Sequence, residues 1–263
     1  MTSFHHKKKF GQHFLKNDII AEQIVDAFIS ACKTKQALEI GPGEGVLTKY
    51  LLKNKSIELF ISEIDNDIIP IIAGKFNIDS THLIHGDFLK MNFDEHFQDE
   101  FSIIGNFPYN ISTEIIFKII EHREKIPMMT GMFQKEVAER IAAKHGNKVY
   151  GITSILTQVF YEVEYLFTVN ENEFTPPPKV KSAVIRLKRK SAVPDGFDQK
   201  IFFQLVKAGF NQRRKTLRNS LKSILLQPKK IDQLILNKRA EQLSVEEWVD
   251  LSFQVKQIVK RPG

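Results

Sequence analysis

Residues 37–51 read ALEIGPGEGVLTKYL, which is a short apolar run, a glycine-rich turn and the start of a helical pattern. The run Ala37–Ile40 predicts a buried strand, and a helix is expected to open at Val46. Glycines in the turn permit positive φ and let a ligand approach the backbone closely. A strand that leads through such a turn into a helix is typical of an open α/β sheet with a ligand site at the strand end.

The alternation of strand and helix patterns continues along the chain. Three more short apolar runs predict buried parallel strands, at Ile57–Ser62, His82–His85 and Phe101–Ile104. Apolar residues recur at helical spacing between and beyond these runs, at 47–52, 68–76 and 112–125. Further strands are expected at Met128–Phe133, Val163–Val169 and Ser182–Leu187. This order predicts a Rossmann-like, doubly wound α/β sheet.

A second, smaller domain is expected at the C-terminal end. The segment KSAVPDGFD at residues 190–198 has the composition of a linker, and the patterns after it are helical. In this helical region after the linker, Ser244 and Glu247 have the spacing of a helix capping box. We therefore expect an α/β domain over 1–189, with a basic N-terminal arm, and an all-α domain over 190–263.

Composition narrows the class of protein. The 263 residues carry a formal charge of +7, which favours a polyanionic partner. The single cysteine, Cys32, cannot form an internal disulfide and is expected to be a core thiol. No stretch has the pattern of a signal peptide or the length of a membrane span, so we expect a cytoplasmic protein that binds no membrane. No hydrophobic seam requires a dimer, and we expect a monomer.

Each of the first four predicted strands is followed by a glycine or a polar residue. These residues are Gly41, Glu63, Asp87 and Asn106, and they lie 22, 24 and 19 residues apart, about one strand and one helix each. Ligands bind beyond the carboxyl ends of the strands in such a sheet. Four neighbouring strands would bring the four residues to a common edge, so the series predicts one binding site there.

The glycine turn and the acids near it indicate a cationic cofactor. A dinucleotide-binding turn has the pattern G-x-G-x-x-G, but here the third glycine comes one position early, and Glu44 would oppose a pyrophosphate. A nicotinamide-dependent oxidoreductase is therefore disfavoured. S-adenosylmethionine fits better, since it carries a sulfonium and an ammonium but no phosphate. Glu63 can accept its ribose hydroxyls and Asp87 its adenine amine, while Gly41 and Gly43 allow close approach. The acids expected to line the crevice are Glu39, Glu44, Glu63, Asp65 and Asp87.

The segment GNFPYN at residues 105–110 indicates chemistry at an exocyclic amine. The N6 lone pair of adenine is delocalised into the ring, so the amine is a weak nucleophile until hydrogen-bond acceptors localise that pair. Asn106 can accept through its side-chain oxygen. Phe107 precedes a proline and is held extended, which can present its main-chain carbonyl as a second acceptor. Tyr109 offers a flat face on which a flipped base can stack. Alone, an Asn-x-Pro pattern is typical of a simple turn, but its place after the fourth strand favours a functional loop.

The chain resembles the ribosomal RNA adenine N6,N6-dimethyltransferase family, most closely the bacterial members that dimethylate two adjacent adenosines in a hairpin near the 3′ end of small-subunit (16S) rRNA. The similarity runs nearly end to end. The segments that carry it are FGQHFL (10–15), EIGPGEGVLT (39–48), SEID with Glu63, GDF with Asp87, GNFPYNIST (105–113), QKEVAERI (134–141), FTPPPKVKSAV (174–184) and FNQRRKTLRNSL (210–221).

This resemblance implies a cofactor site and a pocket for the target adenine. The implied contacts to S-adenosylmethionine are at His13, Leu15, Gly41, Glu63, Asp87 and Asn106. The resemblance also implies that Phe174 packs against the target base opposite Tyr109. Two residues depart from the family pattern, because His13 stands where Asn is more frequent and Phe107 where the bacterial members usually have Leu. Their main-chain contacts are expected to remain.

Basic residues are expected to bind the RNA. Lys7, Lys8 and Lys9 lie in the N-terminal arm, and the segment from Lys207 to Lys222 carries no acid. Its residues expected to bind RNA are Arg213, Arg214, Lys215 and Arg218. The resemblance implies small-subunit rRNA, within the small ribosomal subunit or its precursor, as the partner. His82 and His85 would point to opposite faces of a strand, so no metal site is expected.

Two alternatives share these features. One is the related large-subunit rRNA adenine methyltransferase of the macrolide-resistance type, although the C-terminal segment favours the small subunit. The other is a ribosome assembly factor whose main task is to bind an immature particle, with methylation secondary. The sequence leaves open which of the two roles dominates in subunit biogenesis.

Overall fold

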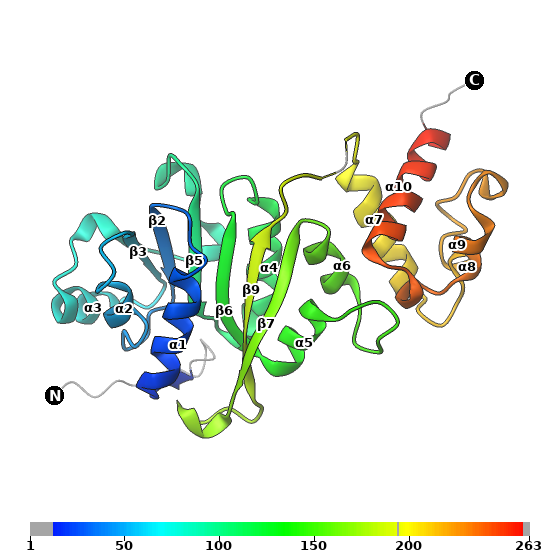
Figure 1. Ribbon diagram of the computed structural model, residues 1–263. Coiled ribbons are helices and arrows are strands. Elements are labelled where there is room, and N and C mark those ends of the chain that lie inside the picture. The colour runs from blue at the N-terminus through cyan, green and yellow to red at the C-terminus, as the bar shows by residue number, and fades with distance from the viewer. Residues whose placement is uncertain (1–12, 194, 260–263) are drawn as a thin grey trace. The chain divides into compact units, whose positions relative to one another are not determined.

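The computed structural model describes residues 13–193 and 195–259, which form two compact units (Figure 1). The first unit contains the described residues up to Ala138 together with Val163–Arg189. The second contains Glu139–Glu162 and the described residues from Lys190 onward. Residues 139–162 therefore group with the C-terminal helices, whereas the boundary expected at 189–190 assigned them to the α/β domain. The physical reason is that helix α6 (Ile152–Gln158) packs against α7 (Gln199–Asn211).

The main sheet contains seven strands in the order β4-β3-β2-β5-β6-β9-β7 among the described residues. Their bounds are β2 Gln36–Ile40, β3 Glu58–Glu63, β4 Leu83–His85, β5 Phe101–Asn106, β6 Met128–Gln134, β7 Tyr161–Val169 and β9 Ser182–Arg189. The five from β4 to β6 are parallel, and β9 runs antiparallel to β6. Each strand expected from the sequence is present, and the Rossmann-like α/β class is confirmed.

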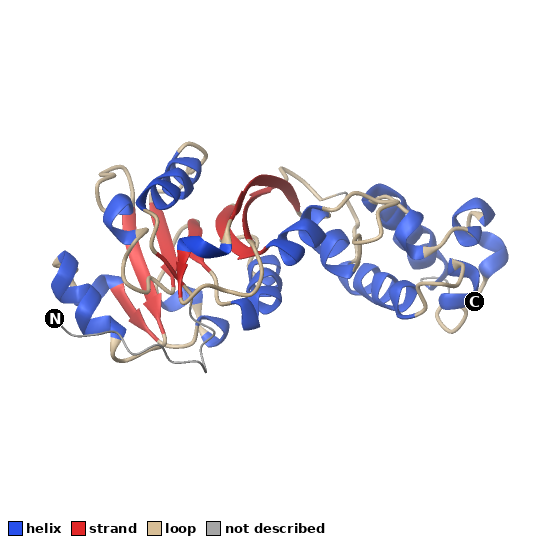
Figure 2. Cartoon of the chain, turned by 90° about the horizontal axis from the view of Figure 1, so that it is seen from below, coloured by secondary structure: helices blue, strands red, loops and turns tan. Residues whose placement is uncertain are grey.

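Helices lie on both sides of this sheet (Figure 2). They are α1 Asp18–Ile29, α2 Thr48–Leu51, α3 Ile68–Phe76 and α4 Ser112–Glu121. On β3, Leu59 and Ile61 join the core cluster that includes residues of α1 and α3, while Phe60 packs on Phe97 outside that cluster. This alternation follows from the two-residue period of a strand, and it buries both faces of the sheet. Helix α4 ends four residues earlier than expected, because the chain turns at residues 122–125 before β6.

Two very short strands form a separate antiparallel pair, β1 (Phe14–Leu15) with β8 (Phe174–Thr175). Short 3-10 turns connect the larger elements of this unit, and they span Ser80–His82, Phe88–Lys90, Phe93–Glu95, Tyr109–Ile111 and Glu171–Glu173. The β1–β8 pair joins parts of the chain about 160 residues apart, so it fixes the start of the described chain against the loop before β9.

The second unit is helical apart from the first two residues of β7, Tyr161 and Glu162. Its remaining helices are α5 Lys135–Ala142, which crosses the unit boundary, α8 Leu217–Ser220, α9 Gln233–Asn237 and α10 Val245–Val259, with 3-10 turns at Pro228–Lys230 and Ala240–Gln242. The predicted capping box is present, since Glu247 N donates to Ser244 Oγ (3.2 Å) and Ser244 N donates to Glu247 Oε2 (2.9 Å). Within the described residues, none of the helices combines the length and apolar character that crossing a bilayer requires.

Candidate active site

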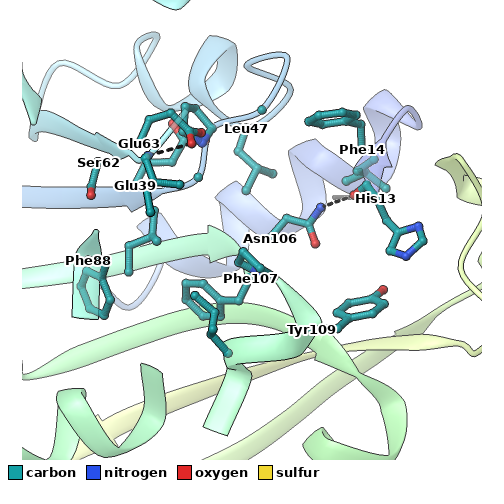
Figure 3. Close-up of a pocket in the computed structure, with 18 of the residues that line it drawn as sticks. His13, Phe14, Glu39, Leu47, Ser62, Glu63, Phe88, Asn106, Phe107 and Tyr109 are labelled. Carbon is teal, nitrogen blue, oxygen red and sulfur yellow. Dashed lines mark hydrogen bonds between the residues drawn. The ribbon is translucent and has the colours of Figure 1, made fainter. Parts of the chain in front are cut away.

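A cavity lies at the carboxyl ends of β2 to β5, and all four strand-end residues line it. Glu63 and Asn106 are labelled among the lining residues in Figure 3. Gly41 follows β2, Glu63 ends β3, Asp87 comes two residues after β4, and Asn106 ends β5. Parallel neighbouring strands have their carboxyl ends at one edge of a sheet, which is why residues so far apart in sequence meet. The predicted convergence of these residues is therefore confirmed.

The glycine turn forms one wall of the cavity. Gly41 has φ +64°, and a Cβ added there would meet nothing within 4 Å, so the backbone is open to a ligand. Gly43 has φ +56°, and a Cβ there would come within 2.6 Å of the Phe14 ring. Both positions therefore require glycine, the first for its backbone conformation and the second also because β1 approaches so closely.

Two buried carboxyl groups lie beside this turn. Glu39 is 1% exposed and accepts a hydrogen bond from Thr48 Oγ1 (2.7 Å). Burial raises the pKa of Glu39 to about 7; the Thr48 hydrogen bond opposes this and the nearby Glu63 reinforces it. Burial also raises the pKa of Glu63, whose Oε1 accepts from the main-chain N–H groups of Ile64 and Asp65 (2.8 Å each). A cationic ligand would favour the charged form of both groups.

The third acid, Asp87, is held by the turn that follows it. Its Oδ1 accepts from Leu89 N (3.0 Å). Lys118 of α4 donates to the carbonyls of Leu89 and Met91 (2.9 Å each), which ties the turn to the helix.

Asp65, also expected in the crevice, is 4% exposed and is not among the residues lining the cavity. The described lining contains no Lys or Arg, so its formal charge is negative.

Asn106 is oriented by the main chain of the N-terminal segment. Its Nδ2 donates to the carbonyl oxygen of His13 (2.9 Å), which leaves Oδ1 as an acceptor in the cavity (Figure 3). Next to it, Phe107 N donates to Met132 O (3.1 Å). Within the described part of the chain, no hydrogen bond ends on the Phe107 carbonyl oxygen. Both oxygens therefore have no protein donor within the described residues, and their role as a pair of acceptors stays a prediction.

The Phe107 side chain anchors this loop to the sheet. Its ring is 1% exposed and lies across the facing residues Gly105 of β5 and Gly131 of β6. A Cβ at Gly131 would lie 2.0 Å from the ring, and one at Gly105 would lie 2.7 Å from it. Sequence reasoning missed Gly131, and only its place inside an apolar strand could have indicated a close approach.

Tyr109 lines the cavity beside this loop. Its hydroxyl group hydrogen-bonds Ser182 Oγ (2.5 Å), and its ring stacks against that of His13, with centroids 5.4 Å apart. Burial raises the pKa of Tyr109, so the phenol is neutral at physiological pH.

The structure does not bring Phe174 to the cavity opposite Tyr109. Phe174 is 1% exposed and belongs to the core cluster that also contains Leu15 and Val169. It pairs with Leu15 across β1 and β8. Leu15 itself does line the cavity. Phe174 is not among the described residues that line the cavity, and its place against the base stays a prediction.

The basic residues expected to bind RNA differ in environment. Lys7, Lys8 and Lys9 lie outside the described residues. Arg213 is partly buried, donates to Lys148 O (2.6 Å) and lies 3.8 Å from Glu241. Arg218 is exposed and donates to Gln233 Oε1 (2.6 Å). The exposed pair Arg214 and Lys215 is the part of this segment most open to an anionic partner.

This fold and this cavity are typical of a methyltransferase with a Rossmann-like α/β domain, which is followed here by a helical unit. A family model described as ribosomal RNA adenine dimethylase matches residues 3–257. The chain therefore belongs to the ribosomal RNA adenine dimethylase family.

Individual proteins agree with this assignment. The chain is 58% identical over 246 residues to a ribosomal RNA small subunit methyltransferase A from Cytophaga hutchinsonii, covering 94% of this chain and 95% of the relative. It is 50% identical to the protein of that name from Flavobacterium johnsoniae, with 95% of each covered. Among solved structures, a dimethyladenosine transferase from Plasmodium falciparum has a TM-score of 0.80 at 27% identity, covering 93% of this chain and 98% of that one. The 23S rRNA methyltransferase ErmE shares the fold, with a TM-score of 0.73 at 23% identity, covering 93% of this chain and all of that one.

Proposed function

We propose that this chain transfers methyl groups from S-adenosylmethionine to the N6 amines of two adjacent adenosines in the 3′-terminal hairpin of small-subunit (16S) rRNA, two groups to each base. The observation that carries the proposal is the orientation of Asn106. Its amide nitrogen is occupied by His13 O, so its oxygen faces the cavity beside the Phe107 carbonyl. The relatives at 50–58% identity are named for the small subunit, which favours it over the large subunit.

The residues of the cavity fit S-adenosylmethionine, which would supply a methyl group made electrophilic by its sulfonium. Glu39, Glu63 and Asp87 give the cavity a negative lining that suits a cation. Glu63 has one oxygen engaged by two N–H groups, and the other can accept ribose hydroxyls. Asp87 would accept from the adenine amine of the cofactor. Gly41 and Gly43 would allow it to lie against the backbone, and His13 and Leu15 would close the same cavity.

At the target base, the chain would supply positioning and hydrogen-bond acceptors. Asn106 Oδ1 and Phe107 O would each accept one N6–H, which localises the nitrogen lone pair toward the methyl donor. The acceptors are fixed before the substrate arrives, so little reorganisation is needed during the reaction. Tyr109 would stack on the flipped base.

Replacement of Asn106 tests this proposal. Asn106→Ala removes one acceptor while Phe107 remains anchored, and we expect kcat to fall about a hundredfold, the typical loss for one preorganised hydrogen-bonding group. Mass spectrometry of rRNA adenosines after reaction with labelled cofactor measures the product, and primer extension on both rRNAs locates it. Asn170→Ala is the matched control, because Asn170 is exposed and its side chain makes no capping hydrogen bond. Full dimethylation by a folded Asn106→Ala protein would contradict the mechanism.

The proposed substrate and the exposed side chains also support a protein that acts as a monomer in the cytoplasm. Ribosomal RNA as substrate implies a reaction in the cytoplasm, on the small subunit or its precursor. Large exposed hydrophobic side chains are dispersed over both units, as in Ile19, Val149 and Leu234, which is consistent with a monomer.

A further inference from the structure

The turn after β4 gives the cavity three consecutive lining residues, Asp87, Phe88 and Leu89. Figure 3 labels Phe88 among the lining side chains. Asp87 is the only one of the three with a polar side chain. One of its oxygens, Oδ1, accepts from Leu89 N (3.0 Å), so the direction of the carboxylate depends on where this turn lies.

This turn is too short to hold its own position. Its 3-10 segment has three residues, Phe88–Lys90, and hydrogen bonds close it from Lys90 N to Asp87 O (2.9 Å) and from Met91 N to Phe88 O (3.2 Å). A single 3-10 turn has few internal hydrogen bonds, and their geometry is poor. An anchor from outside the turn is therefore expected to decide where Asp87 lies.

Lys118 of α4 is such an anchor. Its ammonium group donates to Leu89 O and to Met91 O (2.9 Å each). Hydrogen bonds from a charged donor are stronger than those between neutral groups. Both acceptors are main-chain carbonyls, so Lys118 holds the backbone of the turn and leaves the Asp87 carboxylate for a ligand.

The helix that carries Lys118 is itself fixed in the fold. Four isoleucines of α4 are no more than 1% exposed, namely Ile115, Ile116, Ile119 and Ile120. The helix begins at Ser112, shortly after the loop that carries Asn106. Lys118 therefore connects the turn of Asp87 with the helix that follows the Asn106 loop.

The surroundings of the ammonium group also indicate a specific placement. Lys118 is partly buried, and its Nζ lies 5.0 Å from the ring centroid of Phe93, which is 1% exposed. Burial lowers the pKa of Lys118, and the charges of Glu121 and Asp87 oppose this shift. Most lysines on a helix surface extend their ammonium group into water instead.

We propose that Lys118 is a positioning residue for Asp87, which sets the turn so that the Asp87 carboxylate meets the 6-amino group of the cofactor's adenine; this inference rests on the proposed function. A purine with an oxygen at position 6 has no amine to donate there, and its oxygen would oppose the carboxylate. A site built to accept one particular N–H rejects a ligand that lacks it. Lys118 should therefore contribute to the preference for adenine, although it does not line the cavity.

Calorimetry on the full-length protein measures this preference with two probes, S-adenosylhomocysteine and S-inosylhomocysteine, which differ only in the purine. The unaltered protein should bind the adenine form more tightly. For Lys118→Met we expect the ratio of the two affinities to fall about tenfold, a loss typical of one hydrogen bond to a charged group. Lys118→Arg keeps a charged donor and should keep the ratio within about threefold of the unaltered protein. An unchanged ratio in folded Lys118→Met would overturn the inference, even if both affinities fell.

Two more single variants complete this test. Lys118→Gln also removes the charge, and it serves with the same expected change if Lys118→Met does not fold. Lys90→Met is the matched control, because Lys90 Nζ lies 3.9 Å from Asp87 Oδ2 on a side chain that is 86% exposed. It removes the same charge beside Asp87 without removing an anchor, so the ratio should stay within about twofold. Equal falls in Lys90→Met and Lys118→Met would assign the effect to charge alone and overturn the positioning role.

The Asp87→Ala background shows whether Lys118 acts through Asp87. Once the carboxylate is absent, adding Lys118→Met should change the ratio by less than about twofold, because the two substitutions remove the same interaction. A further large fall would show that Lys118 acts by another route, which contradicts the inference.

The outcomes also separate this inference from the proposed function. If the unaltered protein binds S-adenosylhomocysteine and methylates rRNA while folded Lys118→Met keeps the ratio, the inference alone fails. If the unaltered protein has no measurable affinity for S-adenosylhomocysteine, the proposed cofactor is wrong and the inference fails with it.

Discussion

The carboxyl group of Glu39 lies at the start of the glycine turn, buried and hydrogen-bonded to Thr48. With a pKa near 7, it is largely neutral at pH 6 and largely ionised at pH 7.5 in the unliganded protein. A cationic ligand stabilises the carboxylate, so ligand binding should release a proton over this range. The affinity should therefore fall as the pH is lowered.

Calorimetric titration with S-adenosylmethionine at pH 7.5 and pH 6 checks this sign. We expect the Kd to rise about fivefold at the lower pH, since one unit of pKa is a factor of ten in proton affinity. Glu39→Gln keeps an oxygen that can accept from Thr48 but cannot ionise, so its Kd should vary much less. An equal pH dependence in Glu39→Gln would assign the effect to another group.

At the scale of elements, the loop after β5 depends on the two strands beneath it. The ring of Phe107 fits only because Gly105 and Gly131, which pair across β5 and β6, carry no side chains. Phe107 and Gly131 are therefore matched in size, and we expect this match to hold the loop in place on the sheet.

Gly131→Ala tests this pairing. The added methyl group would displace the Phe107 ring, and we expect a loss of about 2 kcal/mol in unfolding free energy, typical of overpacking, together with slower methyl transfer. Phe107→Leu combined with Gly131→Ala should recover much of the unfolding free energy and of the methyl-transfer rate, because the smaller Leu side chain leaves room for the added methyl group. Chemical denaturation measures the first effect and rRNA methylation the second.

Gly74→Ala is the control for that substitution. Gly74 lies in α3, and a Cβ there would meet nothing within 4 Å. The helix should gain up to about 1 kcal/mol from the change, with methyl transfer unaffected. If Gly131→Ala behaved like Gly74→Ala, the size match would have no energetic role.

At the scale of the whole molecule, the cavity of the proposed reaction lies in the first unit and an exposed basic pair lies in the second. Arg214 and Lys215 are exposed, whereas Arg213 is partly buried near Glu241. Cations that neutralise phosphates release counterions, so RNA binding should weaken as salt rises. The second unit should therefore contribute affinity and little of the chemistry.

Salt titrations of RNA binding test this division. Arg214→Gln with Lys215→Gln should weaken binding and reduce the slope of log K against log salt by about 1 to 2, nearly one for each phosphate that is no longer neutralised. The thermal midpoint should not change, since both residues are exposed. Lys229→Gln with Lys230→Gln removes the same charge from exposed positions of the same unit and should leave the slope closer to that of wild type. Equal effects of the two pairs would indicate a diffuse electrostatic contribution instead.

Much of this protein follows from its sequence alone. Strand and helix periods and the Ser244–Glu247 capping box depend on residues close in the chain, and they predicted the strands and that cap correctly. The spacing from Gly41 to Asn106 repeats about one strand and one helix at a time, and it predicted that these strand-end residues line one cavity. In a parallel sheet, the end of each strand has a fixed place, so a local pattern is enough to locate the cavity.

Only the tertiary structure decided which distant side chains face one another. β1 and β8 have two residues each, too few for any periodic pattern, yet they pair with each other, Phe174 is buried, and His13 stacks on Tyr109. The match of Phe107 with Gly131 and the grouping of residues 139–162 with the C-terminal helices are also long-range contacts. Such contacts depend on which surfaces the folded chain brings within a few ångströms of each other, and local periodicity does not encode that.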